Sequence, residues 1–315
     1  MENDEIVEEY SIEELLQELK IRNQNLRLKK MPSNNNRLKS FSSEHILKII
    51  KKKEEYAYGS SLNKDFFEIS NQQILDDADS VVSIFESSSI QDNKDNTSSL
   101  LTTEFGESYD LCQSEKYRKQ PIGAFCSGVL VGLDIIATTG HGINSSNLLD
   151  TRFIFGFKIK DINETNIVIN NFDIYKGKRI INRKLTDDGP DYALVQLDRK
   201  VMNHNVAIIR TDGKISANTK VHVIGHPCGL PLKLGYDSII KDNSNDSYFV
   251  TNLDTYGGNS GSPVFNSDTH KVEGILVRGE TNFISIGNCN KSLICPTTGC
   301  RGLDCTRTTT FSHLL

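Results

Sequence analysis

The sequence predicts an all-β fold of the barrel type, preceded by a helical N-terminal extension. Between Val81 and Val277, short apolar or alternating stretches are separated by turns rich in Gly, Asn, Asp and Pro. No convincing helical periodicity interrupts this region. Short strands at regular spacing, without intervening helices, are typical of antiparallel barrels.

The extension, residues 1–56, is charged and helical in pattern. Ser11 to Glu14 fits a capping box, and an apolar stripe follows it at Ile12, Leu15, Leu16 and Leu19. A second helix is expected from about Ser43 to the lysine run at 51–53. The favoured interpretation is a solvated helix pair. The functional alternative is a pro-segment or targeting arm that docks on the following domain and is removed near Tyr56–Tyr58.

The expected strands fall into two sets. The first set lies at Val81–Phe85, Val129–Val131, Ile135–Ala137, Arg152–Ile159, Asn166–Ile169, Phe172–Tyr175 and Asp191–Leu197. The second set lies at Ala207–Arg210, Val221–Ile224, Ser247–Thr251, Val264–Phe265 and Val272–Val277. After the first expected strand, the polar segment Ser87–Thr103 predicts a surface loop.

One glycine-rich stretch, Asn252–Phe265, predicts a nucleophile on a tight loop. Ser260 is flanked by Gly258 and Gly261, and glycine lets a substrate carbonyl approach the backbone closely. The N–H groups of Gly258 and Ser260 could then stabilise an oxyanion. Taken alone, such a stretch is more often an ordinary turn.

Two upstream stretches supply what a serine nucleophile needs. An apolar run ends in Thr138-Thr139-Gly140-His141, which delivers His141 to a strand end. Asp191 opens an alternating strand after a turn at Asp187–Pro190. A serine hydroxyl needs a histidine to take its proton, and the histidine needs a carboxylate to fix its tautomer. His141, Asp191 and Ser260 therefore form a candidate catalytic triad.

These three stretches resemble the motifs of the chymotrypsin/trypsin-like serine proteases. Gly-Gly-Asn-Ser-Gly-Ser-Pro-Val at 257–264 looks most like the bacterial glutamyl-endopeptidase branch. The resemblance implies two antiparallel, six-stranded-type β-barrels with the site between them, at residues 57–287. It also implies His141 as general base, Asp191 as orienting acid, Ser260 as nucleophile, and an oxyanion hole from Gly258 and Ser260. No cofactor is expected, and no metal at this site.

The substrate pocket is open between two interpretations. Asp254 lies six residues before Ser260, the spacing that in trypsin-like enzymes selects Arg or Lys. In the glutamyl branch, a threonine at the position of Thr255 and a later histidine select acidic residues, but Leu276 occupies the place of that histidine. Arg278 either compensates as a cation or is simply exposed.

The chain has seven cysteines, and four of them lie in a Cys-rich tail at 288–315. Many family members have a cysteine directly after the catalytic histidine, whereas this chain has Gly142, so the usual bracing disulfide is not expected. Free thiols or a conditional disulfide are favoured for the tail over a structural metal. His226, in Gly225-His226-Pro227-Cys228-Gly229, is expected to be structural.

Composition limits the class of partner. A formal net charge of −5 gives no reason to expect nucleic-acid binding, and no run approaches the roughly 20 apolar residues of a membrane span. The N-terminus lacks the pattern of a secretory signal, which predicts a cytoplasmic location or export by another route. The predicted function is a serine endopeptidase acting on protein or peptide substrates. The alternatives are a catalytically silent or masked protease-fold binding module and, more weakly, an esterase; the oligomeric state is left open.

Overall fold

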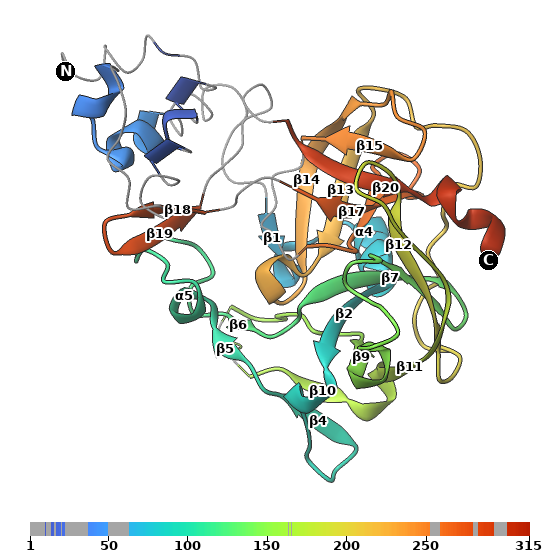
Figure 1. The fold of residues 1–315 in the computed structure, drawn as a ribbon. Coiled ribbons are helices and arrows are strands. Elements are labelled where there is room, and N and C mark those ends of the chain that lie inside the picture. Colours follow the sequence, from blue (N-terminus) through green and yellow to red (C-terminus); the bar gives the residue numbers. More distant parts are fainter. Residues whose placement is uncertain are drawn as a thin grey trace.

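The computed structural model places most of the chain in two β-barrels that lie side by side (Figure 1). The structure describes residues 63–162, 164, 166–252, 259–279, 283–292 and 301–315. Of the N-terminal part it describes residues 10, 14, 15, 17–19, 21, 22 and 37–49.

The first barrel is closed by six antiparallel strands in the order β11-β12-β8-β7-β2-β9. The strands are β2 (Val81–Glu86), β7 (Cys126–Gly132), β8 (Ile135–Thr138), β9 (Thr151–Ile154), β11 (Ile174–Leu185) and β12 (Asp191–Leu197). Alternate side chains of these strands, among them Val82, Leu130, Ile136, Phe153 and Val195, fill its interior.

The second barrel is also closed. Its strands are β13 (Lys220–Gly225), β14 (Lys233–Asp242), β15 (Tyr248–Thr251), β16 (Pro263–Asn266), β17 (Val272–Arg278) and β20 (Leu303–Arg307). Pairing of β14 with β15 closes the ring, and β1 (Asn63–Asp65) adds to its outside along β14. The two-barrel prediction is confirmed.

An apolar cluster joins the two barrels. Val129 and Leu194 of the first barrel pack in one cluster with Ile224, Phe265 and Ile275 of the second. The same cluster takes in Phe311 near the C-terminus, whose ring lies 5.2 Å from that of Tyr192. Burial of these side chains holds the barrels in a fixed relation, which is what a site built from both of them requires.

Two expectations about the second barrel need correction. The expected tail at 288–315 contains β20, which pairs with β15 and β17, so the second barrel extends beyond residue 287. Leu303 and Cys305 are buried in that barrel, and the polar residues between and after them, Asp304, Thr306 and Arg307, are buried as well. A strand with three buried polar residues in five has no clear apolar signal in the sequence. Ala207–Arg210 is not a strand, because only Ile209 forms an isolated bridge, to Val272.

The segment Ser87–Thr103 is not a plain loop. It contains β3 (Ile90–Asp92) and β4 (Thr97–Leu100), which pair with each other, and β4 also pairs with β10 (Val168–Asn170). Lys94 and Asn96 take positive φ values of 66° and make the reversal between the strands. Two short strands, β5 (Thr103–Glu104) and β6 (Pro121–Ile122), pair next to it.

Helices are few in the described part of the chain. They include α4 (Gln72–Asp79), which begins at the Asn71 cap and leads into β2, and the short α5 (Phe105–Ser108). Single 3₁₀ turns occur at Arg37–Ser40, Phe66–Glu68, Ser87–Ser89, Leu148–Asp150, Asn171–Asp173, Pro227–Gly229, Thr308–Thr310 and Ser312–Leu314. Among the described helices, none has the length and apolar character that a membrane span needs.

The described N-terminal residues pack on a hairpin. The hairpin consists of β18 (Phe283–Ile286) and β19 (Cys289–Ser292). Ile284 joins an apolar cluster with Leu15, Leu19, Leu38, Ile46, Leu47 and Ile49 of the N-terminal part. A disulfide between Cys112 and Cys289 ties the hairpin to the segment that follows α5. The sequence had left the pairing of these cysteines open.

Candidate active site

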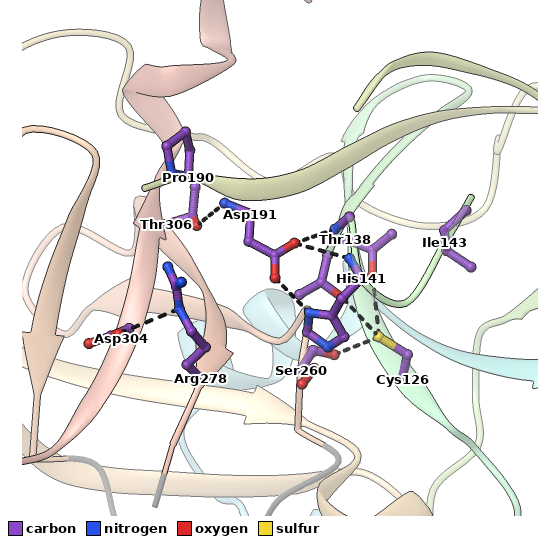
Figure 2. A network of polar contacts seen from close by, with 12 residues as sticks. Cys126, Thr138, His141, Ile143, Pro190, Asp191, Ser260, Arg278, Asp304 and Thr306 are labelled. Atoms are coloured by element: carbon purple, nitrogen blue, oxygen red, sulfur yellow. Dashed lines mark hydrogen bonds and ion pairs between the residues drawn. The ribbon is translucent and has the colours of Figure 1, made fainter. Parts of the chain in front are cut away.

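His141 and Asp191 meet at neighbouring strand ends of the first barrel (Figure 2). His141 follows β8 after a two-residue turn, and Asp191 is the first residue of β12, which pairs with β8. Asp191 Oδ2 lies 2.6 Å from His141 Nδ1. Its other oxygen, Oδ1, accepts hydrogen bonds from the N–H groups of Gly140 at 2.6 Å and His141 at 3.1 Å. Three contacts therefore fix one carboxylate against one imidazole.

Burial divides the roles of the two side chains. The side chain of Asp191 is 3% exposed, whereas that of His141 is 41% exposed. A buried carboxylate that accepts several hydrogen bonds has one available orientation. The ring of His141 is held through Nδ1, so Nε2 is free to face a bound molecule.

The turn that carries His141 is held by close backbone contacts. Arg183 Nε donates to the carbonyl oxygens of Gly140 at 2.7 Å and Ile143 at 3.0 Å. A side chain at position 140 would place its Cβ 2.6 Å from the carbonyl oxygen of Lys184. Glycine is therefore required here for close approach of two backbone segments.

Ser260 reaches the same place from the second barrel (Figure 2). Its carbonyl oxygen accepts from the N–H of Ser127 at 2.8 Å and from the thiol of Cys126 at 2.9 Å. The same sulfur lies 3.5 Å from Thr139 Oγ1, two residues before His141. The Ser260 peptide is thus fixed against the strands that lead to the histidine.

Gly261 makes this approach possible. Its φ is +87°, and an added Cβ would lie 2.0 Å from the carbonyl oxygen of Ser127. Its N–H donates to the Leu276 carbonyl at 2.7 Å, which holds the loop to β17. Both the positive φ and the close contact exclude any larger residue.

The structure does not describe every residue of the predicted site. Gly258, Asp254 and Thr255 lie outside the described residues. Among the described contacts, none joins the Ser260 hydroxyl to His141 by a hydrogen bond. Such bonds are often long in ligand-free enzymes and tighten when substrate binds.

The side chain of Arg278 binds the turn that precedes Asp191. Its guanidinium donates to the carbonyl oxygens of Thr186 at 3.3 Å, of Asp187, and of Gly189 at 2.7 Å. Nε lies 3.5 Å from Asp304 Oδ2. Arg278 therefore joins β17 and β20 of the second barrel to the turn that precedes Asp191 (Figure 2).

Thr306 is a contact that the sequence did not reveal. Its hydroxyl accepts a hydrogen bond from the N–H of Asp191 at 3.0 Å, across 115 residues of chain. Thr306 is fully buried on β20, in the segment that was expected to be a tail. No local pattern identifies such a residue, because its role depends on the closure of the second barrel.

The cysteine and histidine environments agree with structural roles. Cys126 is buried, and burial raises the pKa of its thiol. Burial lowers the pKa of His226 to about 3, so this imidazole is neutral, and its Nδ1 lies 3.0 Å from the Leu230 carbonyl. Burial also raises the pKa of Cys228 to about 12. None of these groups carries a charge at neutral pH.

Comparison with known proteins gives one family match. The family model of the trypsin-like peptidase domain matches residues 126–275, just under half of the chain, and this range includes His141, Asp191 and Ser260. No curated protein sequence matches the chain.

Two solved structures are similar in overall shape. The human heparin binding protein is 11% identical, with a TM-score of 0.48 over 80% of this chain and 92% of that one. The Vibrio cholerae VesB protease is 13% identical, with a TM-score of 0.48 over 80% of this chain and 65% of that one. The fold of two closed barrels and the matched domain together define a trypsin-like protease fold, which supports a serine protease function in general.

Proposed function

We propose that the chain is a serine endopeptidase that cuts peptide bonds through an acyl-enzyme intermediate. Ser260 Oγ attacks the substrate carbonyl carbon while its proton moves to His141 Nε2. His141 then passes that proton to the leaving amine as the C–N bond breaks. Water attacks the resulting ester, gives a proton to His141, and the acid product leaves as Ser260 regains its proton. The buried Asp191 stabilises the imidazolium that forms twice in each cycle.

The observation that carries this proposal is the fixed His141–Asp191 pair beside the anchored Ser260 peptide. The 2.6 Å contact between Nδ1 and Oδ2 selects the tautomer that leaves Nε2 able to accept a proton. The carbonyl oxygen of Ser260 accepts hydrogen bonds from two groups of β7, the Ser127 N–H and the Cys126 thiol. These bonds fix the backbone of the nucleophile itself. The N–H groups of Ser260 and Gly258 are the proposed oxyanion donors.

Cleavage of a mixed peptide library tests the proposal. Wild type and Ser260→Ala are compared, with His141→Ala as a second variant that keeps the serine. We expect cleavage by wild type only, with kcat reduced by about 10⁴ or more in either variant. The wild-type protein is assayed both as the full chain and as a chain that begins at Ala57. If neither form cuts any peptide, and a serine-directed phosphonate does not label Ser260, the chain is a silent binding module and the proposal fails.

The same library reads the substrate preference. Enrichment of Arg or Lys before the cut bond would assign the pocket to Asp254. Enrichment of Glu or Asp would support the glutamyl-endopeptidase branch and a role for Thr255. The contacts of Arg278 with Thr186, Asp187 and Gly189 argue that it supports the active-site acid instead of binding substrate.

We further propose that residues 1–56 act as a latency segment. Their described apolar side chains, including Leu15, Leu19 and Ile46, bury Ile284 of the β18–β19 hairpin. That hairpin lies between β17 and β20 in the chain, directly after the strand that holds the Ser260 loop. A chain beginning at Ala57 is expected to be more active than the full chain. Equal activity of the intact chain, with Met1 retained, would exclude a latency role.

A further inference from the structure

A second cluster of titratable side chains lies away from the candidate active site. Asp77 comes from the last turn of α4, His222 from β13, and His270 from the turn between β16 and β17. Asp77 Oδ2 lies 2.5 Å from His270 Nδ1 and 3.1 Å from His222 Nε2. The three potential ligand atoms all lie within 4.8 Å of one another.

The cluster is held in place by its surroundings. Asp77 and His222 are buried, and His270 is partly exposed. The ring of His222 stacks on Phe265 at 5.3 Å, and its Nδ1 lies 3.1 Å from Ser267 Oγ. In the metal-free contact Nε2 donates to the Asp77 carboxylate. When a metal takes the place of that proton, the Ser267 hydroxyl can accept from Nδ1–H and hold the tautomer that binds a metal through Nε2.

The backbone of His270 also favours an inward-facing ring. His270 takes a φ of 56°, an uncommon value for a residue with a side chain. Its N–H donates to the Asn266 carbonyl at 2.9 Å, and Asn266 Oδ1 accepts from Asp268 and Thr269. The turn thus holds the His270 imidazole against Asp77 in a conformation with an energetic cost.

The electrostatics of α4 favour a cation beside Asp77. A carboxylate in the last turn of a helix faces the negative end of the helix dipole, and α4 has no basic residue in that turn. Asp79, in the same turn, has the opposite arrangement to Asp77: it shares His204 with Asp173, so two carboxylates flank one imidazole. At Asp77, two imidazoles flank one carboxylate, which provides three ligands for a single cation.

We propose that Asp77, His222 and His270 bind one divalent transition metal ion, with zinc as the best match. Two imidazole nitrogens and one carboxylate oxygen are a common zinc ligand set, and a water molecule would complete the tetrahedron on the partly exposed side of His270. Ligand atoms about 2.0–2.2 Å from zinc lie about 3.3 Å apart, so only small side-chain shifts are needed. Calcium and magnesium are poorer matches because they prefer oxygen ligands.

The bound ion would act as a clip between the barrels. Asp77 lies 145 residues from His222 and 193 residues from His270 in the chain. Helix α4 runs into β2 of the first barrel, whereas the two histidines belong to the second barrel. An ion that binds only the folded arrangement raises the free energy of unfolding. The site is independent of the proposed peptidase chemistry.

Titration of the metal-free full chain with zinc tests the site. The protein carries Ser260→Ala to prevent self-digestion, together with Cys295→Ser and Cys300→Ser to remove two thiols that could bind zinc. Calorimetry is expected to show one zinc ion per chain, and the unfolding temperature should rise with zinc. His270→Ala should weaken binding by about a hundredfold or more, as expected for loss of a ligand.

Two controls make the result decisive. His204→Gln removes a histidine from the other Asp–His cluster and should leave zinc affinity unchanged. Cobalt binding should give the visible spectrum of a tetrahedral nitrogen–oxygen site without a sulfur charge-transfer band. The proposal is wrong if zinc does not bind stoichiometrically to the folded chain, or if it binds equally well to His270→Ala. The cluster would then be only a set of hydrogen bonds between Asp77 and the two histidines.

Discussion

Gly142, directly after His141, is the residue that leaves Cys126 as a free thiol. A Cβ added at position 142 would lie 3.0 Å from Cys126 Sγ. The distance from a Cβ to its partner's sulfur in a disulfide is about 3 Å. We therefore predict that Gly142→Cys forms a disulfide with Cys126 under oxidising conditions. Closing a loop of about 15 residues stabilises a protein by about 3 kcal/mol in the chain-entropy model.

Thiol counting and thermal unfolding measure the outcome. Oxidised Gly142→Cys should show one free thiol fewer per chain than wild type, and its unfolding temperature should fall on reduction. Gly142→Ser is the matched control, since it adds a side chain of similar size that would also crowd Thr139 Oγ1. An oxidised variant with one free thiol more than wild type, counted after unfolding, would mean that Cys126 and the introduced cysteine do not pair.

Thr306 supports Asp191 from the opposite barrel. Thr306→Val keeps the shape of the side chain but removes the oxygen that accepts from the Asp191 N–H. A buried N–H left without a partner costs about 1–3 kcal/mol. We expect lower stability in urea and a lower kcat, because Asp191 also orients His141. Thr306→Ser, which keeps the hydroxyl, should recover most of the kcat; if Ser and Val behave alike, the hydrogen bond is not what matters.

At the scale of single residues, the sequence predicted the site residues that lie in short recognisable motifs and missed those that do not. His141, Asp191 and Ser260 each lie in a strand-and-turn motif, so they could be selected as a candidate triad. Thr306 and Arg183 contact the same site through barrel closure and strand register, which no short motif encodes. The proposed zinc ligands were likewise missed, because three separate elements bring them together.

At the scale of elements, Arg278 of β17 braces the turn before β12. A planar guanidinium can donate to several carbonyls at once, whereas a lysine ammonium cannot reproduce that geometry. We predict that Arg278→Met and Arg278→Lys both lower kcat by about tenfold, because the Asp187–Pro190 turn loosens and Asp191 loses its exact placement. KM should change little, since the guanidinium faces that turn.

Peptidase kinetics separate this bracing role from substrate binding. The control is Arg152→Met, which removes an arginine whose guanidinium donates to the carbonyl oxygens of Leu149 and Thr151 in its own segment. That variant should keep wild-type kcat. If Arg278→Met instead raises KM or changes the residue preferred before the cut bond, Arg278 belongs to the substrate pocket after all.

The strands that the sequence predicted well have strong apolar alternation. β8 and β12 match their expected ranges closely, because buried Val, Ile and Leu dominate them, whereas β7 begins three residues before the expected Val129–Val131 and ends one residue after it. β3 and β4 were missed because they are polar and joined by a turn whose residues also suit a loop. Ala207–Arg210 was wrongly expected to be a strand, since apolar residues there bury only part of their surface against the barrel core.

At the scale of the whole molecule, paired charges at the end of α4 set a pH dependence of stability. His204 Nδ1 lies 2.8 Å from Asp79 Oδ1, and Nε2 lies 3.2 Å from Asp173 Oδ1. Burial lowers the pKa of His204, but hydrogen bonds with Asp173 and Asp79 outweigh it and raise the pKa to about 9. Burial raises the pKa values of Asp79 and Asp173, but contacts including His204 outweigh it and lower both.

The sign of the effect follows from these directions. Because the folded pKa of His204 lies above its ordinary value of 6.5, its stabilising contribution is complete below pH 6.5 and is lost as pH rises through about 9. The contributions of the two carboxylates are present above their ordinary pKa values and are lost in acid. From the His204 shift, the contribution near neutral pH is on the order of 3 kcal/mol.

Denaturant unfolding across pH 6 to 10, compared between wild type and His204→Gln, tests this prediction. The free-energy difference between the two should be largest near pH 6 and should shrink steadily toward pH 10, because the wild-type contact loses its charge there. His313→Gln changes an exposed histidine near the C-terminus and should follow wild type at every pH. A difference between wild type and His204→Gln that stays constant with pH would mean that His204 acts through its stacking on Phe155, at 4.1 Å, and not through its charge.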